Sequence, residues 1–339
     1  MLKNIKNKIS ISVLALTLGV SAASANLSAS EYNWRFSNLY SRGTAFGDVY
    51  ESLAKNIEKN TAGKVKVQVL FSGEGVGTSG LLGAVKSGLI TVAAPFQSMH
   101  AGELPAGVIE IGLPGGTDDP SKLMSLFNDK GWNEILTKAY GSQGMVWLTP
   151  YIQPAVYIIT KNPISSVADF KGLKIRAPGA YGKFLRNLGA SPVSLAWSEI
   201  YTSLATGVID GSIGSNMIDH RDGNHVEVAK YMYKLPLAGA QVLPIVVNRN
   251  DWKKLPEDLQ AGVRKATVQH AADQLRLSKQ WESEALAEMI SKGLKWSPEP
   301  SVEDRAAWSD ASATLYDEYA AKDKYSKQLV DILKKENAE

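Results

Sequence analysis

Strand-like and helix-like segments alternate along most of this chain, and this order constrains its fold more than any other feature. Residues 34–37 read as a first strand, apolar residues at helical spacing predict a helix over 44–60, and residues 65–69 alternate as in a half-buried strand. Such an order is typical of α/β proteins with largely parallel sheets. The chain has 339 residues. A single hydrophobic core seldom organises so many residues, so we expect two lobes.

The alternation continues through the middle of the chain and gives way to helix near its end. From Pro256 onward the pattern is helical, with a break over 293–300. In the middle we expect Ser198 to cap a helix that Gly207 ends. The predicted strands of this region are 144–148, 155–160, 173–176 and 241–248, and its predicted helices are 181–188 and 198–206.

The first 25 residues have the pattern of an export signal. Three lysines precede an apolar run over 9–20, and the small residues Ala23, Ser24 and Ala25 follow it. The run is about a dozen residues, shorter than the roughly 20 that a membrane-spanning helix needs. We therefore predict a signal peptide over 1–25 and a periplasmic protein. An uncleaved N-terminal anchor is the alternative.

Composition excludes several classes of function. The chain has no cysteine, which rules out a lipid-anchored cysteine, disulfides, thiol catalysis and thiolate metal sites. Its 37 basic residues exceed its 34 acidic ones only by the three lysines of the export signal, so a nucleic-acid partner is disfavoured. We find no nucleophile elbow, no HExxH and no paired-carboxylate motif, so nothing in the sequence indicates catalysis.

Four motifs in a fixed order carry a family resemblance. They are SVADFKGLKIRAPGA (166–180), LRNLGASPVSL (185–195), SEIYTSLATGVIDG (198–211) and VVNRNDWKKLPEDLQ (246–260). This order resembles the DctP-type solute-binding proteins of tripartite ATP-independent periplasmic (TRAP) transporters. The most similar subgroup binds 2-oxo acids and related monocarboxylates. A weaker similarity covers most of the remaining chain.

The resemblance implies an architecture and a role. The fold would be α/β and type II-like: two lobes with mixed sheets flanked by helices, joined by crossing strands and by a long helix that spans both. Lobe I would comprise 26–152 and about 241–280, and lobe II about 153–240 and 281–339. The protein would be a monomer without a cofactor that captures a small organic carboxylate in a closing cleft and delivers it to integral membrane permease subunits. The alternatives are a binding protein for an ATP-driven importer or a sensor, and a periplasmic enzyme.

Arg176 is the first candidate for the ligand contact. It ends an apolar strand, and Ala177, Pro178 and Gly179 force a loop directly after it. A guanidinium there can present two parallel charge-assisted hydrogen bonds to a carboxylate. An arginine at a strand end is more often a surface ion pair, but the resemblance aligns this position with the arginine that clamps the substrate carboxylate in the family.

The second ligand-contacting position of the family departs from the subgroup's pattern. Where that subgroup has a Glu-Trp pair that supports a metal ion, this chain has Ile213 and Gly214, and Ala238 aligns with a later acidic ligand. A bound cation needs several oxygen ligands, so we expect no metal. Neutral hydrogen-bonding candidates remain: Ser212, Ser215 and above all Asn216, whose alternative role is to cap a loop.

Further candidates follow from strand ends and from the resemblance, each beside a simpler reading. Gln153 is either a ligand contact or a turn residue before Pro154. Phe96 and Gln97 follow an apolar strand at the expected cleft edge, where Phe96 could equally be core. Trp197 and Tyr151 are either aromatic walls of the cleft or core residues. Arg42 is either a second cation at the cleft or an ordinary exposed arginine.

Two motifs resemble known functional sites but have simpler explanations. Residues 75–80 form a GxGxxG pattern, but they do not open a clean βαβ unit, and a glycine-rich loop at the cleft explains them equally well. The cluster Asp219, His220, Asp222 and His225 contains metal-capable side chains. Its spacing does not place both histidines on one helical face, so we predict a solvated loop there.

Overall fold

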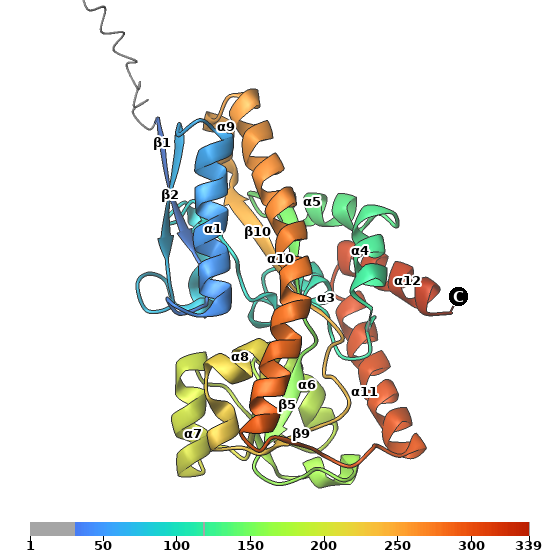
Figure 1. Ribbon diagram of the computed structural model, residues 1–339. Coiled ribbons are helices and arrows are strands. Elements are labelled where there is room, and N and C mark those ends of the chain that lie inside the picture. Colours follow the sequence, from blue (N-terminus) through green and yellow to red (C-terminus); the bar gives the residue numbers. More distant parts are fainter. Residues whose placement is uncertain (1–30, 118, 339) are drawn as a thin grey trace, which may run out of the picture.

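The computed structural model describes residues 31–117 and 119–338. The predicted export signal lies outside these residues. The described chain forms two α/β lobes, one above the other in Figure 1, each built on its own sheet. No helix in the described part of the chain combines the length and the apolar character needed to span a bilayer.

The five-stranded sheet of lobe I has the order β2-β1-β3-β10-β4. Parallel pairs join β1 to its two neighbours, and β10 runs antiparallel to both β3 and β4. The sheet is therefore mixed, as predicted. Its strands are β1 (Tyr32–Ser37), β2 (Val65–Leu70), β3 (Val92–Ala93), β4 (Met145–Gln153) and β10 (Gln241–Asn248).

The six-stranded sheet of lobe II has the order β11-β9-β5-β8-β6-β7. It is also mixed, with β6 parallel to β7 and β8, and β5 antiparallel to β8 and β9. The chain crosses between the lobes from β4 to β5 and returns from β9 to β10. The strands are β5 (Tyr157–Thr160), β6 (Lys174–Arg176), β7 (Ser191–Val193), β8 (Gly211–Ser215), β9 (Tyr231–Met232) and β11 (Lys295–Trp296).

Helix α1 (Ala45–Asn60) forms where the apolar spacing predicted it. The side chain of Thr44 caps its first turn by accepting a hydrogen bond from the backbone N–H of Gly47. Its buried face packs on the lobe I sheet through Phe46, Val49 and Leu53. The other helices of lobe I are α2 (Leu81–Ser87), α3 (Pro105–Glu110), α4 (Pro120–Asn128), α5 (Trp132–Ser142) and α9 (Arg249–Lys254).

Lobe II carries α6 (Gly179–Asn187), α7 (Ile200–Thr206) and α8 (Met217–Asp222). Gly207 ends α7 in the left-handed conformation, as expected, but Ser198 does not cap it. A 3₁₀ turn over Trp197–Glu199 precedes the helix, and the carboxylate of Glu199 accepts the backbone N–H of Ala196. The helix therefore starts later than the sequence pattern suggested.

Helix α10 (Glu257–Ser291) spans both lobes, as the resemblance implied (Figure 1). Its 35 residues give a length of about 52 Å. It packs against α1 and β4 of lobe I and against α8 of lobe II. A helix that packs against both lobes restricts how the lobes can move relative to each other.

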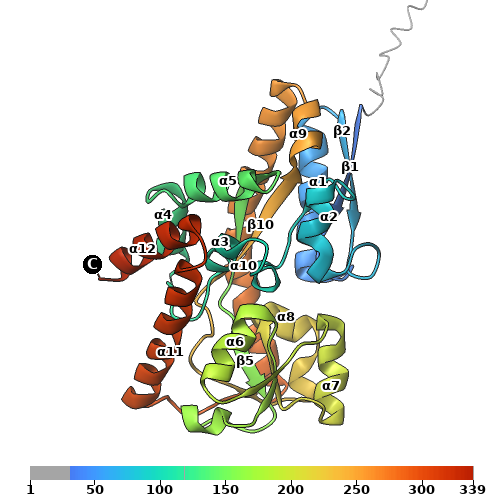
Figure 2. The same cartoon turned by 180° about the vertical axis from the view of Figure 1, so that it is seen from behind.

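The last two helices bridge back over the molecule. Helix α11 (Val302–Ala320) contacts α3 and α6, and α12 (Lys324–Ala338) packs against α3 and α5 of lobe I (Figure 2). Our boundary assigned the whole of 281–339 to lobe II, so it differs from the structure at α12. The apolar face of this helix finds its partner in lobe I because α11 carries the chain back across the seam.

A carboxylate lies at the centre of lobe I. Glu110 is fully buried, and its two oxygens accept hydrogen bonds from the Tyr140 hydroxyl (2.5 Å) and the Trp147 indole N–H (2.6 Å). Burial raises the pKa of Glu110 from 4.5 to about 8, although both hydrogen bonds oppose the rise.

This buried carboxylate should make stability depend on pH. Between about pH 4.5 and pH 8 the folded state holds a proton that the unfolded chain has lost, so the free energy of unfolding should fall as pH rises through this range. Glu110→Gln cannot titrate and should flatten that fall. Urea unfolding of both proteins at pH 5 and pH 8.5 measures it; equal slopes in wild type and variant would contradict the prediction.

Candidate ligand-binding site

A cavity of about 260 Å³ lies between the lobes. It is formed where strands of both sheets end and their loops meet, the usual place for a ligand in α/β proteins. Its lobe I wall consists of Leu39, Ser72, Thr78, Ser79, Phe96 and Met99, and its lobe II wall of Arg176, Pro178, Ser194, Leu195, Ala196 and Trp197.

Arg176 ends β6 between two neighbouring strands and lies in this wall. The side chain is only 8% exposed, and its Nη1 donates to the Ile213 carbonyl (2.8 Å) and its Nε to the Leu195 carbonyl (3.2 Å). These two bonds orient the guanidinium and leave other N–H donors of its five. Burial lowers the pKa of Arg176 to about 10, and the negative charge of Asp219 opposes this. No carboxylate in the described part of the chain forms an ion pair with it.

Asn216 stands directly after β8, three residues after Ile213, whose carbonyl holds Arg176, and it is not part of the cavity wall. Its side-chain oxygen caps α8 by accepting the backbone N–H of Asp219 (3.0 Å), so the capping role is real. The amide nitrogen of the same side chain is buried and has no hydrogen-bond partner. A buried donor without a partner is costly, so this nitrogen has unused hydrogen-bonding capacity. Ser215 belongs to β8, but its side chain lies outside the described residues.

Gln153 and Tyr151 lie at the end of β4. The Tyr40 hydroxyl donates to the Gln153 side-chain oxygen (2.9 Å). The ring of Tyr151 stacks on Tyr50 with 5.9 Å between the ring centroids, and its buried hydroxyl has no partner. Neither Gln153 nor Tyr151 is part of the cavity wall, so any contact with a ligand would have to form as the lobes adjust around it.

Phe96 and Trp197 face each other across the cavity from opposite lobes. Phe96 packs edge-on against Tyr181, with 6.2 Å between the ring centroids, and Trp197 lies 5.8 Å from the ring of His225. Phe96 is therefore part of the core as well as the wall, and Trp197 is a partly buried residue packed against the core. The indole N–H of Trp197 is buried without a partner.

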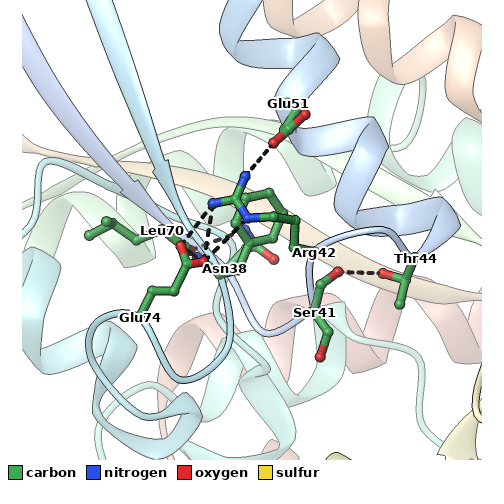
Figure 3. Close-up of polar contacts among 8 residues, drawn as sticks. Asn38, Ser41, Arg42, Thr44, Glu51, Leu70 and Glu74 are labelled. Carbon is green, nitrogen blue, oxygen red and sulfur yellow. Dashed lines mark hydrogen bonds and ion pairs between the residues drawn. The ribbon is translucent and has the colours of Figure 1, made fainter.

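Two predicted residues have partners elsewhere. The Gln97 amide nitrogen donates to the Tyr140 hydroxyl inside lobe I, within the buried network of Glu110. Figure 3 shows Arg42 held between Glu51 (2.8 Å) and Glu74 (3.0 Å), and its guanidinium lies 4.1 Å from the centroid of the Phe71 ring. Neither residue reaches the cavity wall.

Several wall residues were missed by sequence reasoning. Leu39 and Ser72 follow the parallel strands β1 and β2, so strand ends were the available signal. Thr78 and Ser79 belong to the GxGxxG loop, which supports its reading as a cleft loop. Met99 and Ser194 carry no local signal that distinguishes them from ordinary loop residues.

The histidine cluster does not form a solvated loop as we predicted. Asp219, His220 and His225 are buried, and the two histidines approach each other through their Nδ1 atoms (3.0 Å). The spacing argument failed because the chain turns back after α8, with Asn224 in the left-handed conformation (φ 53°). Within 31–117 and 119–338 no group of three His, Cys, Asp or Glu side chains is placed to hold a metal ion.

The lobes also contact each other outside the cavity. The Asp222 carboxylate accepts the backbone N–H of Ala45 (3.0 Å), and the Ser98 hydroxyl donates to the Pro178 carbonyl (3.1 Å). The backbone N–H of Ala180 in turn donates to the Ser98 hydroxyl (3.0 Å). These contacts hold the two walls of the cavity together.

A sequence model of one family, described as bacterial extracellular solute-binding protein, family 7 (DctP), matches residues 36–323. The monocarboxylate 2-oxoacid-binding periplasmic protein of Nostoc sp. is 28% identical over 305 residues, which cover 88% of this chain and 82% of that protein. The C4-dicarboxylate-binding periplasmic protein DctP of Rhodobacter capsulatus is 27% identical, over 91% of this chain and 93% of that protein.

Solved structures show the same fold. A TRAP periplasmic solute-binding protein from Pseudoalteromonas atlantica, solved with bound sodium and pyruvate, superposes with a TM-score of 0.82 at 26% identity. The match covers 90% of this chain and 93% of that one. The two-lobed architecture is therefore common to both proteins.

Proposed function

Because this chain belongs to the DctP family of bacterial extracellular solute-binding proteins, we propose that it captures a small organic carboxylate between its lobes and delivers it to a TRAP permease. The relatives named above bind organic acids according to their names, and they are periplasmic binding proteins rather than enzymes. In the same way we propose that this chain acts in the periplasm as a monomer, without catalysis and without a cofactor.

Arg176 is the single observation that carries the proposal. It is a buried cation at a cavity wall, it is oriented by two backbone carbonyls, and no carboxylate of the described residues neutralises it. Burying an uncompensated charge is expensive unless a partner arrives. Charge-assisted hydrogen bonds are worth about 1.5 to 3 kcal/mol each, and a micromolar complex needs only about 8 kcal/mol, so one arginine can supply a large share.

Closure of the lobes completes the proposed mechanism. In an open form the carboxylate would dock on Arg176, and lobe I would then cover it with Phe96 and the loop of Thr78 and Ser79. The ligand stabilises the closed form only by as much as it binds that form better. We propose Trp197 and Phe96 as direct contacts, and Asn216, Gln153 and Tyr151 as residues that adjust toward the ligand. Ser215 remains a predicted contact. We leave out Gln97 and Arg42 because they have other partners.

We propose that no metal ion assists binding. The positions that align with the acidic ligands of the metal-binding subgroup are occupied by Ile213 and Ala238, and both side chains are buried among apolar neighbours. The backbone carbonyl of Ile213 accepts a hydrogen bond from Arg176. This differs from the Pseudoalteromonas atlantica protein, which was solved with sodium.

A thermal-shift screen of the chain from residue 26 onward against a panel of organic acids tests the function. A ligand at about 100 times its dissociation constant should add roughly 2.7 kcal/mol of apparent stability. Stabilisation by at least one carboxylate, with the compound recovered unchanged by NMR, is the expected result. Turnover would favour an enzyme instead, and a panel without any stabilising carboxylate would overturn the proposal.

A further inference from the structure

The wall of the cavity between the lobes carries a single charge. Of the twelve described residues that line it, only Arg176 is ionised, and none is acidic. This arginine is only 8% exposed. A ligand with one carboxylate therefore brings the cavity to neutrality. A second carboxylate on the ligand would be enclosed between the lobes without a cation of its own, which costs free energy.

The rest of the wall offers few hydrogen-bonding groups. Seven of the twelve residues are apolar or aromatic, and four carry only a hydroxyl group on their side chains: Ser72, Thr78, Ser79 and Ser194. A sugar acid, with a hydroxyl on nearly every carbon, needs a partner for each hydroxyl that it buries. The wall has no amide or carboxylate side chain to supply such bonds, so its lining suits a ligand with an apolar body.

Two aromatic side chains enter this lining from opposite lobes. Phe96 of lobe I lies edge-on to Tyr181, with 6.2 Å between the ring centroids, and Trp197 of lobe II lies 5.8 Å from the ring of His225. These neighbours fix the position of each ring beside the cavity, so a ligand need not order them. A flat ring in the cavity gains favourable contacts with both, and the sulfur of Met99 in the same wall is a further partner for it.

We propose that the preferred ligand is a small aromatic monocarboxylate, whose carboxylate binds Arg176 and whose ring lies between Phe96 and Trp197. This inference rests on the proposed function and adds to it the class of substrate. The cavity volume of about 260 Å³ lies just below the range of about 300 to 1,000 Å³ that is usual for ligand pockets, which suits a single ring. The Rhodobacter capsulatus relative is named for C4-dicarboxylates, whose second charge finds no cation in this wall.

Matched acids test the inference. Benzoate and cyclohexanecarboxylate share the carboxylate and the six-membered ring and differ in aromaticity, as do phenylacetate and cyclohexylacetate. Terephthalate adds a second carboxylate to benzoate, and glucuronate carries a hydroxylated ring. In titration calorimetry we expect at least one aromatic acid to bind about threefold or more tighter than its saturated partner. It should bind about tenfold or more tighter than terephthalate and glucuronate.

Variants of the two aromatic residues locate the ring of the ligand. Phe96→Leu and Trp197→Leu each keep an apolar side chain but remove an aromatic face, so each should lower the preference for the aromatic acid over its saturated partner to about twofold or less. Since this preference is a ratio measured within one variant, a general loss of stability does not change it. Tyr201→Leu removes an exposed aromatic ring of lobe II outside the cavity wall and should keep the preference.

A new cation in the wall tests the charge argument. Met99 belongs to the lobe I wall and is 36% exposed, so a lysine can replace it without being forced into the core. Met99→Lys should raise the affinity for terephthalate relative to benzoate by about tenfold or more, because the second carboxylate then has a partner. Leu89→Lys adds the same charge to an exposed side chain of lobe I outside the wall and should leave this ratio unchanged.

The outcomes distinguish this inference from the proposed function. If a saturated, dianionic or hydroxylated acid binds as tightly as every aromatic acid, the inference is wrong and the proposed function stands. A preference for the aromatic acid that survives both Phe96→Leu and Trp197→Leu would also overturn the inference, because the ring would then lie elsewhere. Absence of binding by any carboxylate would overturn the proposed function and the inference together.

Discussion

Replacing Arg176 with alanine should weaken binding of the best carboxylate ligand by about 30- to 4,000-fold, because removing one partner of a buried charge pair costs about 2 to 5 kcal/mol. The guanidinium is the cation of the cavity wall, and two backbone carbonyls hold its orientation. The apparent stabilisation by ligand in a thermal-shift assay should disappear, and isothermal titration calorimetry measures the change in affinity.

The fold should survive this substitution. Arg176 forms no ion pair with a described residue, so no described carboxylate would lose its partner. Arg176→Lys is the matched variant: it keeps the charge but loses the planar fork, so it should retain part of the affinity. Melting temperatures of the empty proteins check that both variants are folded. Undiminished binding by Arg176→Ala would show that the anion is held by other groups.

Replacing Gly179 with alanine should block closure of the lobes and reduce ligand affinity by about tenfold or more. Gly179 begins α6 in lobe II, and a Cβ atom there would overlap the backbone carbonyl of Ser98 in lobe I. A backbone atom cannot rotate away as a flexible side chain can. The left-handed conformation of Gly179 (φ 56°) adds a local cost of about 1 to 2 kcal/mol for alanine. Calorimetry and the ligand-induced change in radius of gyration by X-ray scattering measure the outcome.

Gly189→Ala separates blocked closure from backbone strain. Gly189 also has a positive φ (89°), but its added Cβ would make only ordinary contacts with Lys171 within lobe II. We expect it to lower the melting temperature without a comparable loss of affinity. If both glycine variants lose affinity equally, strain within lobe II rather than contact between the lobes explains the effect.

Arg176→Ala and Gly179→Ala examine two parts of one mechanism. Arg176 concerns the binding of the anion, and Gly179 concerns the approach of the lobes. Since Ser98 lies two residues after Phe96 and Gly179 lies three residues after Arg176, closure moves the apolar wall toward the cation. Grip and closure are therefore expected to be coupled energetically, and a double variant should lose less than the sum of the two.

Local patterns were sufficient to predict most of the fold. The helix over 44–60, the strand over 241–248 and the helical C-terminal region were confirmed as α1, β10 and α10 to α12. Helical and strand periodicities depend on neighbouring residues, so they can be read from a single chain. The start of α7 was missed because a 3₁₀ turn occupies Trp197–Glu199. The lobe assignment of α12 differs because, besides the adjacent α11, this helix packs against α3 and α5, which are more than 180 residues away in sequence.

Fewer of the predicted contacts lie in the cavity wall, and these differences share a cause. Gln97 and Arg42 follow strands at the expected edge, yet Gln97 points into the core toward Tyr140, and Arg42 has two glutamates within reach. Asp219 and the two histidines look like a polar loop in sequence but are buried where α8 packs against α1 and α10. Burial of a polar side chain depends on such distant neighbours and leaves no local trace.

By itself, then, the sequence determined the α/β class, the family and the strand-end arginine, because these depend on periodicity and on short motifs that remain together along the chain. The tertiary structure alone decided which polar groups surround that arginine, and above all that two backbone carbonyls hold it while no carboxylate of the described residues forms an ion pair with it. The physical reason is that electrostatics at this seam depend on distances between β6, α1 and α8, and packing sets those distances only after the two lobes have come together.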